Sequence, residues 1–141
     1  MFIGKHDRSL DDKGRLVLPT NFRRDFEGGA VLAPWDRCVA VWTRPSFEEV
    51  LAQLLTKARE GEAEQDLVRL FQADAWEISL DGQGRILVPD SHRRFAGIDR
   101  EVKVIGQNTH IELWNAARYA AMEREKSPAE IWEKFHELKV F

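Results

Sequence analysis

The chain has 141 residues, of which 43% are hydrophobic and 32% are charged, and its formal net charge is −3. This length fits one domain or two small intertwined halves, and the composition is that of an ordinary globular protein. No apolar run approaches the roughly 20 residues that span a bilayer, and the first residues lack an apolar signal-peptide core, so we expect a cytoplasmic protein without a membrane partner.

The residue types that build metal and catalytic sites are sparse. Cys38 is the single cysteine, which excludes an internal disulfide, and its apolar neighbours predict a buried thiol. The four histidines are scattered without metal-ligand spacing. The chain has no CxxC pair, no glycine-rich phosphate loop and no Ser/His/Asp order. We therefore expect no metal, no cofactor and no enzymatic activity.

The most informative feature is a repeat. Residues 9–19 read SLDDKGRLVLP, residues 79–89 read SLDGQGRILVP, and six of these positions are identical at an offset of 70. A pair of arginines follows four residues after the proline in each copy. Because self-similarity at a fixed offset marks repeated structural units, the sequence predicts two halves, residues 1–70 and 71–141.

Each copy of the repeat predicts a β-hairpin. In the second copy, residues 76–80 alternate between apolar and polar types, as a half-buried strand does. Residues 82–84 then turn the chain, and residues 86–88 run back. In the first copy, residues 12–14 form the turn and residues 16–18 the return strand. Each three-residue loop ends in glycine, which suits a left-handed backbone because glycine has no Cβ.

A short helix and a second pair of strands follow each hairpin. Pro19 and Pro89 suit the first position of a helix, and Gly28 and Gly97 mark where the helices end. These signals predict helices over 22–26 and 91–95. The strand pairs that we expect next are 30–33 with 38–42, and 102–105 with 111–114, where CVAVW at 38–42 is echoed by HIELW at 110–114.

Helices complete each half. Thr43 and Asn115 occupy equivalent places and are good N-caps. Gly61 ends the first helix, and a second is expected over about 62–73. Ser127-Pro128-Ala129-Glu130 is a capping box that opens the last helix. We therefore expect an α+β fold in which two pseudo-symmetric, hairpin-containing repeats form a small β-barrel-like core with peripheral helices.

The repeated turn has the form Asp-x-x-x-Arg: Asp11 with Arg15, and Asp81 with Arg85. The aspartate can accept hydrogen bonds from the turn amides, and the arginine leaves the turn on the return strand. If a pseudo-two-fold axis relates the halves, both arginines point the same way from one surface, and a guanidinium fork suits phosphate or the edge of guanine. A purely structural interpretation stays open, in which these are good hairpin turns with a surface ion pair.

The charges are unevenly distributed. Residues 1–24 carry a local charge of +3, and the acidic residues gather in the predicted helices. The chain is therefore expected to have a basic side and an acidic side. Arg23-Arg24 and Arg93-Arg94 are weaker candidates, because one arginine of each pair is expected on a solvated helix face. Most of the five tryptophans are expected to serve as core or interface anchors.

The opening MFIGKHDRSLDDKGRLVLP and the two Asp-x-x-x-Arg turns about 70 residues apart resemble the MraZ family of bacterial regulators. The resemblance covers nearly the whole chain. The half-domains of that family are similar to the AbrB-type swapped-hairpin DNA-binding fold. The resemblance implies a pseudo-symmetric protomer in a ring-shaped homo-oligomer. It also implies a nucleoid-associated repressor that binds direct repeats in double-stranded DNA ahead of its own operon of division and cell-wall genes.

Carried over by position, the resemblance assigns Asp11 and Arg15, with Lys13 in the turn, to the first motif and Asp81 and Arg85 to the second. The candidate DNA-binding residues are therefore Arg15, Lys13 and Arg85, to which we add Gln83 of the second turn and Lys5 and Arg8 of the basic opening segment. The residues that shape the turns are Asp11, Gly14, Asp81 and Gly84. The turns differ, since Gln83 stands where the first copy has Lys13. Arg15 and Lys13 should therefore contribute more than Arg85, while Gln83 can still hydrogen-bond to an adenine edge.

Two other functions stay open. The chain could be a protein-interaction module of AbrB-like fold, which docks a partner through its acidic helices and uses the hairpins only as structure. An enzyme has the least support, and would require a cleft lined by ionisable groups with strongly shifted pKa values.

Overall fold

The two repeats produce the same series of elements, and the computed structural model describes them over residues 1–140. In the first repeat these are β1 (Lys5–Ser9), β2 (Arg15–Val17), α1 (Thr20–Arg23), the 3-10 helix η1 (Arg24–Phe26), β3 (Ala30–Trp35), β4 (Cys38–Thr43), α2 (Arg44–Arg59) and α3 (Gln65–Ala73). In the second they are β5 (Trp76–Ile78), β6 (Arg85–Leu87), α4 (Asp90–Ala96), β7 (Glu101–Gln107), β8 (His110–Asn115), α5 (Ala116–Glu125) and α6 (Pro128–Glu137). The predicted α+β class is confirmed.

The main sheet is antiparallel and has the strand order β1-β7-β8-β4-β3-β5. When each strand is replaced by its counterpart in the other repeat, the same order is read in reverse. The predicted pairs β3–β4 and β7–β8 form as local hairpins, and β4 pairs with β8 at the centre of the sheet. The outer strands are exchanged, since β1 joins β7 of the second repeat and β5 joins β3 of the first.

The predicted hairpins at the start of each repeat are wrong in their pairing. The turns close, but the two arms of each hairpin separate: β2 pairs with β6 of the other repeat in an antiparallel ribbon apart from the main sheet. Two further hydrogen bonds extend the ribbon, from the amide of Leu18 to the carbonyl of Gly84 and from the amide of Val88 to the carbonyl of Gly14. The exchange ties the two halves into one unit.

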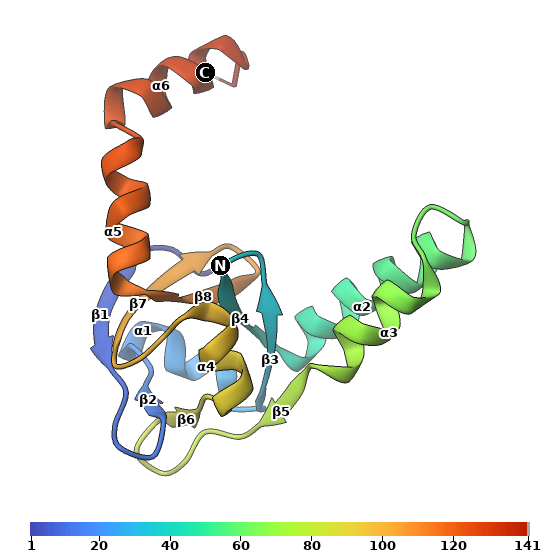
Figure 1. The fold of residues 1–141 in the computed structure, drawn as a ribbon, viewed down its shortest axis with the longest axis vertical. Helices are drawn as coiled ribbons and strands as arrows, with labels where there is room; N and C mark the ends of the chain where they lie inside the picture. Colours follow the sequence, from blue (N-terminus) through green and yellow to red (C-terminus); the bar gives the residue numbers. More distant parts are fainter. Residues whose placement is uncertain (141) are drawn as a thin grey trace.

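The predicted barrel-like core is not closed. The outer strands β1 and β5 are not paired with each other in the part of the chain that is described. β5 has three residues, all paired with β3, and the chain then leaves the sheet for the turn and β6. The ribbon is a separate two-stranded sheet at the lower end of the body in Figure 1.

The main core lies between the sheet, the ribbon and the short helices that follow β2 and β6. Leu16 and Ile86 point inward from the centre of the ribbon and are fully buried. Along β4, Val39 and Val41 belong to this core, whereas Ala40 and Trp42 face the other side, where α2 and α3 cover them. The central strands are thus buried on both faces, as their apolar sequences require.

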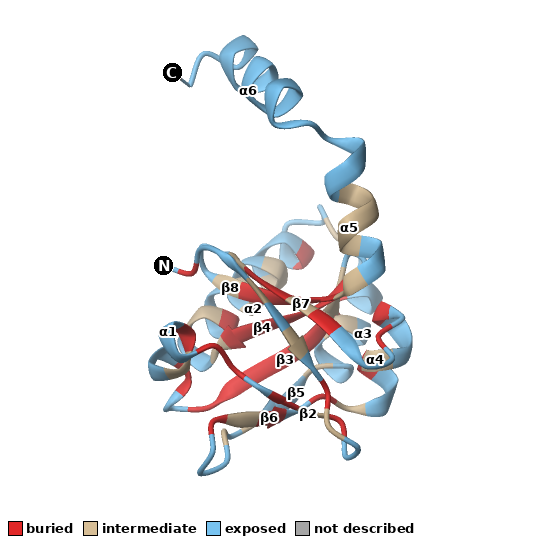
Figure 2. Ribbon diagram, turned by 90° about the vertical axis from the view of Figure 1, so that its left-hand side faces the viewer, coloured by how far each residue is buried: buried red, intermediate tan, exposed pale blue. Residues whose placement is uncertain are grey.

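Pro19 and Pro89 are N-caps and not the first helical residues that we predicted, so α1 begins at Thr20 and α4 at Asp90. The three predicted caps of the longer helices are confirmed. The side chains of Thr43 and Asn115 accept hydrogen bonds from the amides of Ser46 and Arg118, and Ser127 forms the predicted capping box with Glu130. α3 begins at Gln65, three residues later than expected. α2–α3 and α5–α6 extend from the body as two arms, and α6 is exposed along its length (Figures 1 and 2).

None of the described helices is both long and apolar enough to cross a bilayer. Cys38 is fully buried, as predicted, and its thiol contacts the carbonyl of Trp35 at 3.0 Å. Burial raises the pKa of this thiol well above its usual value, so the sulfur stays protonated.

Replacing Leu16 by alanine should lower the free energy of unfolding by about 2–5 kcal/mol, because it opens a cavity beneath the ribbon. The matched control is Leu87→Ala, which removes the same side chain from the same ribbon at a site that is 39% exposed. It should cost less than about 1 kcal/mol. Chemical denaturation measures both, and equal losses would show that the ribbon does not cover the core.

Candidate nucleic-acid interface

The first turn is held by a single carboxylate. Oδ1 of Asp11 accepts hydrogen bonds from the amides of Lys13 at 2.9 Å and Arg15 at 2.8 Å. Oδ2 accepts one from Nε of Arg15 at 2.7 Å. Gly14 takes a φ of +78°, which side chains disfavour, and its amide donates to the carbonyl of Asp11. The aspartate, the glycine and the arginine are therefore needed together at this spacing.

The second turn repeats the same contacts. Oδ1 of Asp81 accepts from the amides of Gln83 and Arg85, both at 2.9 Å, and Oδ2 accepts from Nε of Arg85 at 2.7 Å. Gly84 has a φ of +73°. The donor–acceptor distance of each of these hydrogen bonds differs from that of its counterpart in the first turn by no more than 0.1 Å. The predicted acceptance of turn amides by the aspartate is confirmed in both copies.

The ribbon brings the two turns onto one face. Arg15 lies opposite Leu87 and Val17 lies opposite Arg85, and in a strand alternate residues share a face. With Leu16 and Ile86 buried, these four side chains point outward. Nη1 of Arg85 lies 4.0 Å from Oδ2 of Asp11, so the second motif directly contacts the first.

The arginines do not extend freely from this face. Their side chains are only 30% (Arg15) and 24% (Arg85) exposed, because each bends back to its aspartate. The exposed residues at the tips are Asp12 and Lys13 in the first turn and Gly82 and Gln83 in the second. The motif ion pairs use Nε, which leaves the terminal nitrogens of Arg15 as donors for another acceptor.

The other predicted DNA-binding residues are divided between two places. Arg8 lies beside the ribbon, where Nε donates to the carbonyl of Val17 at 3.2 Å and Nη1 to the carbonyl of Asp7 at 2.8 Å. Lys5 lies at the far end of β1, roughly 20 Å along the chain from Asp11. Its Nζ pairs with Glu123 of α5 at 2.6 Å, which raises the pKa of Lys5. The structure therefore groups Arg8 with the turns and separates Lys5 from them.

One cation beside the first turn was missed. Nη1 of Arg100 lies 3.7 Å from Oδ1 of Asp12, and the carbonyl of Arg100 accepts from the amide of Leu10. Arg100 comes from the second repeat and reaches the first turn because β1 is paired with β7. The sequence did not indicate that Arg100 lies beside the first turn. The predicted local hairpin pairs the arm before Asp11 with residues 16–18, and this pairing would leave Arg100 far from Asp12.

The arginine pairs divide as predicted, with one member of each pair on the surface. Arg24 is exposed, and Arg94 is exposed and paired with Asp90. Arg23 and Arg93 are partly buried beneath the turns. Sequence reasoning identified both pairs but not which member faces the turn.

The tryptophans serve mainly as packing residues. Trp42 and Trp114 are buried, and Trp35 packs edge-on against Trp42 with ring centroids 5.3 Å apart. Glu112 is a buried acid beside them and contacts His110 and Trp114, both at 3.0 Å. Burial raises the pKa of Glu112, but these two hydrogen bonds outweigh it and leave the pKa below its usual value. The group is satisfied internally and serves the core.

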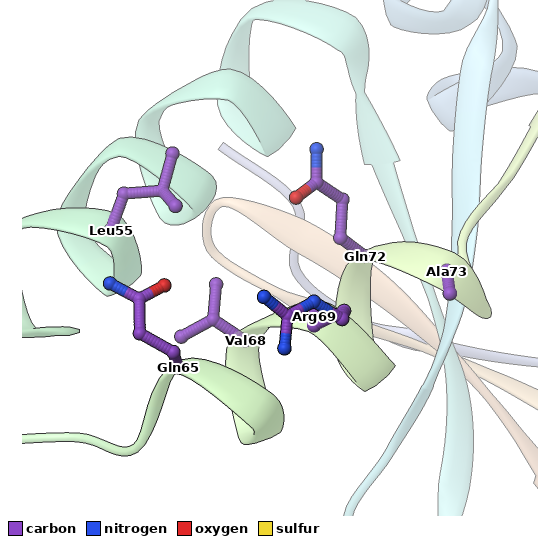
Figure 3. A pocket seen from close by; sticks show the side chains of 6 residues that line it. All are labelled: Leu55, Gln65, Val68, Arg69, Gln72 and Ala73. Atoms are coloured by element: carbon purple, nitrogen blue, oxygen red, sulfur yellow. The ribbon is translucent and has the colours of Figure 1, made fainter.

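A groove of about 360 Å³ lies between α2 and α3 (Figure 3), on the arm that extends from the body away from the turns (Figure 1). Leu55 of α2 faces Gln65 and Val68 of α3 across it. The one ionisable side chain in its lining is Arg69, which pairs with Asp66. Such a lining offers neither a nucleophile nor a general base.

In each turn, the backbone amide of the arginine, followed by its side chain, holds the pKa of the aspartate below the usual 3.8. A carboxyl with a lowered pKa stabilises the fold above its unfolded pKa, and this contribution is lost as the pH falls through the folded value. Below about pH 4 the protein should therefore lose stability more steeply than the double variant Asp11→Asn/Asp81→Asn. Unfolding midpoints across pH 2–5 measure this, and parallel curves would contradict it.

Comparison with known proteins agrees with the repeat. The family described as "MraZ protein, putative antitoxin-like" matches residues 1–70 and again 71–139. A protein named Transcriptional regulator MraZ from Frankia casuarinae (strain DSM 45818 / CECT 9043 / HFP020203 / CcI3) is 41% identical over 137 residues, which is 95% of this chain and 96% of that protein. One of the same name from Clavibacter michiganensis subsp. michiganensis (strain NCPPB 382) is 40% identical over 120 residues, 84% of each chain. The chain therefore belongs to the MraZ family.

Proposed function

We propose that this chain is a sequence-specific DNA-binding transcriptional regulator, which acts at the nucleoid as a repressor of its own operon of division and cell-wall genes. The observation that carries the proposal is the outward face of the β2–β6 ribbon. There two turns of the same backbone geometry hold Arg15 and Arg85 side by side, with Lys13 and Gln83 at the tips. The names of the relatives support the regulatory role.

The chemistry of this face suits duplex DNA. The major groove is about 12 Å wide and admits a two-stranded β-ribbon, and arginine can bind O6 and N7 of guanine in a bidentate manner. The ion pairs to Asp11 and Asp81 fix the direction of each guanidinium before DNA arrives, which lowers the ordering cost of binding. Lys13 adds a mobile charge for phosphate.

The net charge of −3 does not oppose this assignment, because residues 1–24 carry a local charge of +3 and the excess of acidic residues lies in the rest of the chain. The arm of α5 and α6 leaves the body at the end opposite the turns (Figure 1). The acidic residues of this arm are Glu123, Glu125, Glu130, Glu133 and Glu137. The same segment carries as many basic side chains, namely Arg118, Arg124, Lys126, Lys134 and Lys139, so the arm has no net negative charge that would repel a duplex.

The two turns are alike in backbone but differ in their charged side chains. The first turn carries Asp12 and Lys13 at its tip with Arg100 nearby, whereas Gly82 and Gln83 stand in the places of Asp12 and Lys13 in the second. An unequal pair of turns gives one protomer a polarity on DNA, so it prefers one orientation of its site. Protomers that share an orientation match direct repeats, which is the arrangement we propose for the operator.

We also propose that the chain assembles into a ring-shaped homo-oligomer. Apolar side chains on the two arms remain exposed in the protomer, including Leu67 and Leu70 on α3 and Ile131 on α6. Apolar surface of this kind is typical of an interface. One protomer contacts only a few phosphates, and joining copies raises avidity by roughly 10²–10⁴ when the geometry allows simultaneous contact.

Arg15→Ala should abolish the gel shift of the chain's own upstream DNA, with an affinity loss of at least about 10–100-fold, because each protomer then lacks one of its two guanidinium groups for DNA. The salt dependence of binding should also become shallower, by about 0.9 for each phosphate that is no longer neutralised. The control is Arg59→Ala, which removes the same charge from an exposed site at the end of α2. Sedimentation should show the same assembly for all three proteins.

Retained binding by Arg15→Ala, with an unchanged salt slope, would favour the alternative in which the turns are structural and the chain docks a protein.

Exchanging the tip residues tests the inequality of the turns. Lys13→Gln should weaken DNA binding, and Gln83→Lys should strengthen non-specific binding and steepen the salt slope by about 0.9. Neither side chain is buried, so the stability of the fold should stay within about 0.5 kcal/mol of the original. Fluorescence anisotropy at several salt concentrations measures both effects, and equal salt slopes in the three proteins would contradict the prediction.

A further inference from the structure

An arginine lies directly beneath each turn and comes from the other repeat. Arg23 of the first repeat lies beneath the second turn, and Arg93 of the second repeat lies beneath the first turn. A Cβ placed on Gly84 would collide with Nε and Cζ of Arg23 and lie 2.7 Å from its Cδ. A Cβ placed on Gly14 would lie 3.0 Å from Cζ of Arg93. The glycines are therefore required twice, once for their positive φ and once because a guanidinium of the other repeat occupies the place of a side chain.

The two contacts occupy corresponding places in the repeats but differ in detail, because Arg93 also pairs with Asp90 of its own repeat at 3.5 Å. Nη2 of Arg23 donates to the carbonyl of Leu18 at 3.1 Å, and the amide of Leu18 donates to the carbonyl of Gly84. On the other side, the amide of Val88 donates to the carbonyl of Gly14, and Arg93 lies against that glycine. Each arginine thus packs where the ribbon meets the turn of the opposite repeat.

Both guanidinium groups are partly removed from water. The side chain of Arg93 is 28% exposed, and Nε is buried without a hydrogen-bond partner in both Arg23 and Arg93 among the described residues. Burying such a donor is unfavourable. By contrast Arg24 and Arg94, their neighbours in sequence, are exposed. The same unfavourable burial occurs at the same position in both repeats, under the part of the molecule that we propose contacts DNA.

We propose that Arg23 and Arg93 are positioning residues for DNA binding. Each supports the turn of the opposite repeat from below, so that the Asp-x-x-x-Arg loops keep one fixed spacing and act as a unit. The contacts are crossed: Arg23 of the first repeat supports the second turn, and Arg93 of the second repeat supports the first. This role rests on the proposed DNA-binding function, but the crossed support itself can be measured without DNA.

Hydrogen–deuterium exchange of the full chain tests the crossed support. Arg23→Ala should raise amide exchange in residues 81–88 more than in 11–18, and Arg93→Ala should do the reverse. Arg24→Ala and Arg94→Ala are matched controls, because they remove the same charge from exposed neighbouring positions and should leave both turns protected. An effect confined to the variant's own repeat, or one no larger than that of the controls, would overturn the proposal.

Anisotropy with a labelled duplex from the chain's own upstream DNA provides the functional readout. Arg23→Ala and Arg93→Ala should each bind at least about tenfold more weakly than Arg24→Ala and Arg94→Ala. Equal affinities within each pair would overturn the positioning role. Failure of the unaltered protein to bind duplex would contradict the proposed function instead, and the exchange pattern would still report whether the crossed support exists.

A second pair of variants serves if Arg23→Ala does not fold. Gly84→Ala and Gly61→Ala both place a side chain at positive φ, +73° and +78°, but the added Cβ meets Arg23 in the first and open space in the second. Gly84→Ala should therefore displace Arg23 and lower the melting temperature more than Gly61→Ala. It should also shift the Nε–H resonance of Arg23, and an unmoved resonance with equal melting temperatures would overturn the proposal.

Discussion

The pairing of β2 with β6 is the interaction on which the rest of the structure depends. It joins the return strands of the two repeats, buries Leu16 and Ile86 at the centre of the core, and places Arg15 and Arg85 on one outward face. Separate hairpins would leave each repeat with its own turn and no fixed relation between them. The exchange therefore produces both the stability of the fold and the geometry of the proposed DNA surface.

The cationic character of this face depends more on the fixed direction of its guanidinium groups than on the number of positive charges. The two aspartates orient the arginines by hydrogen bonds of 2.7 Å, while Lys13 remains exposed at the tip of the first turn. An acidic chain can in this way present a small cationic surface of defined shape. The backbone symmetry supplies two equivalent turns, and the difference between Lys13 and Gln83 makes them chemically unequal.

Much of this could be predicted from the sequence. The caps at Thr43 and Asn115 located the helix starts, and the repeated turn located the site. The pairing of the return strands could not be predicted from local pattern, because β2 and β6 have the same alternation and bury the same residues in a local or an exchanged hairpin. Only the resemblance to a swapped-hairpin fold implied the exchange. Arg100 was missed for the same reason, and nothing in a doublet such as Arg23-Arg24 indicates which arginine faces the other repeat.

The most direct test of the central claim is a structure of the assembly bound to its upstream DNA. The account predicts that the β2–β6 ribbon lies in the major groove, with Arg15 and Arg85 of the same protomer both within hydrogen-bonding distance of bases or phosphates. A duplex seated on the helical arms, with the ribbon left uncovered, would contradict it.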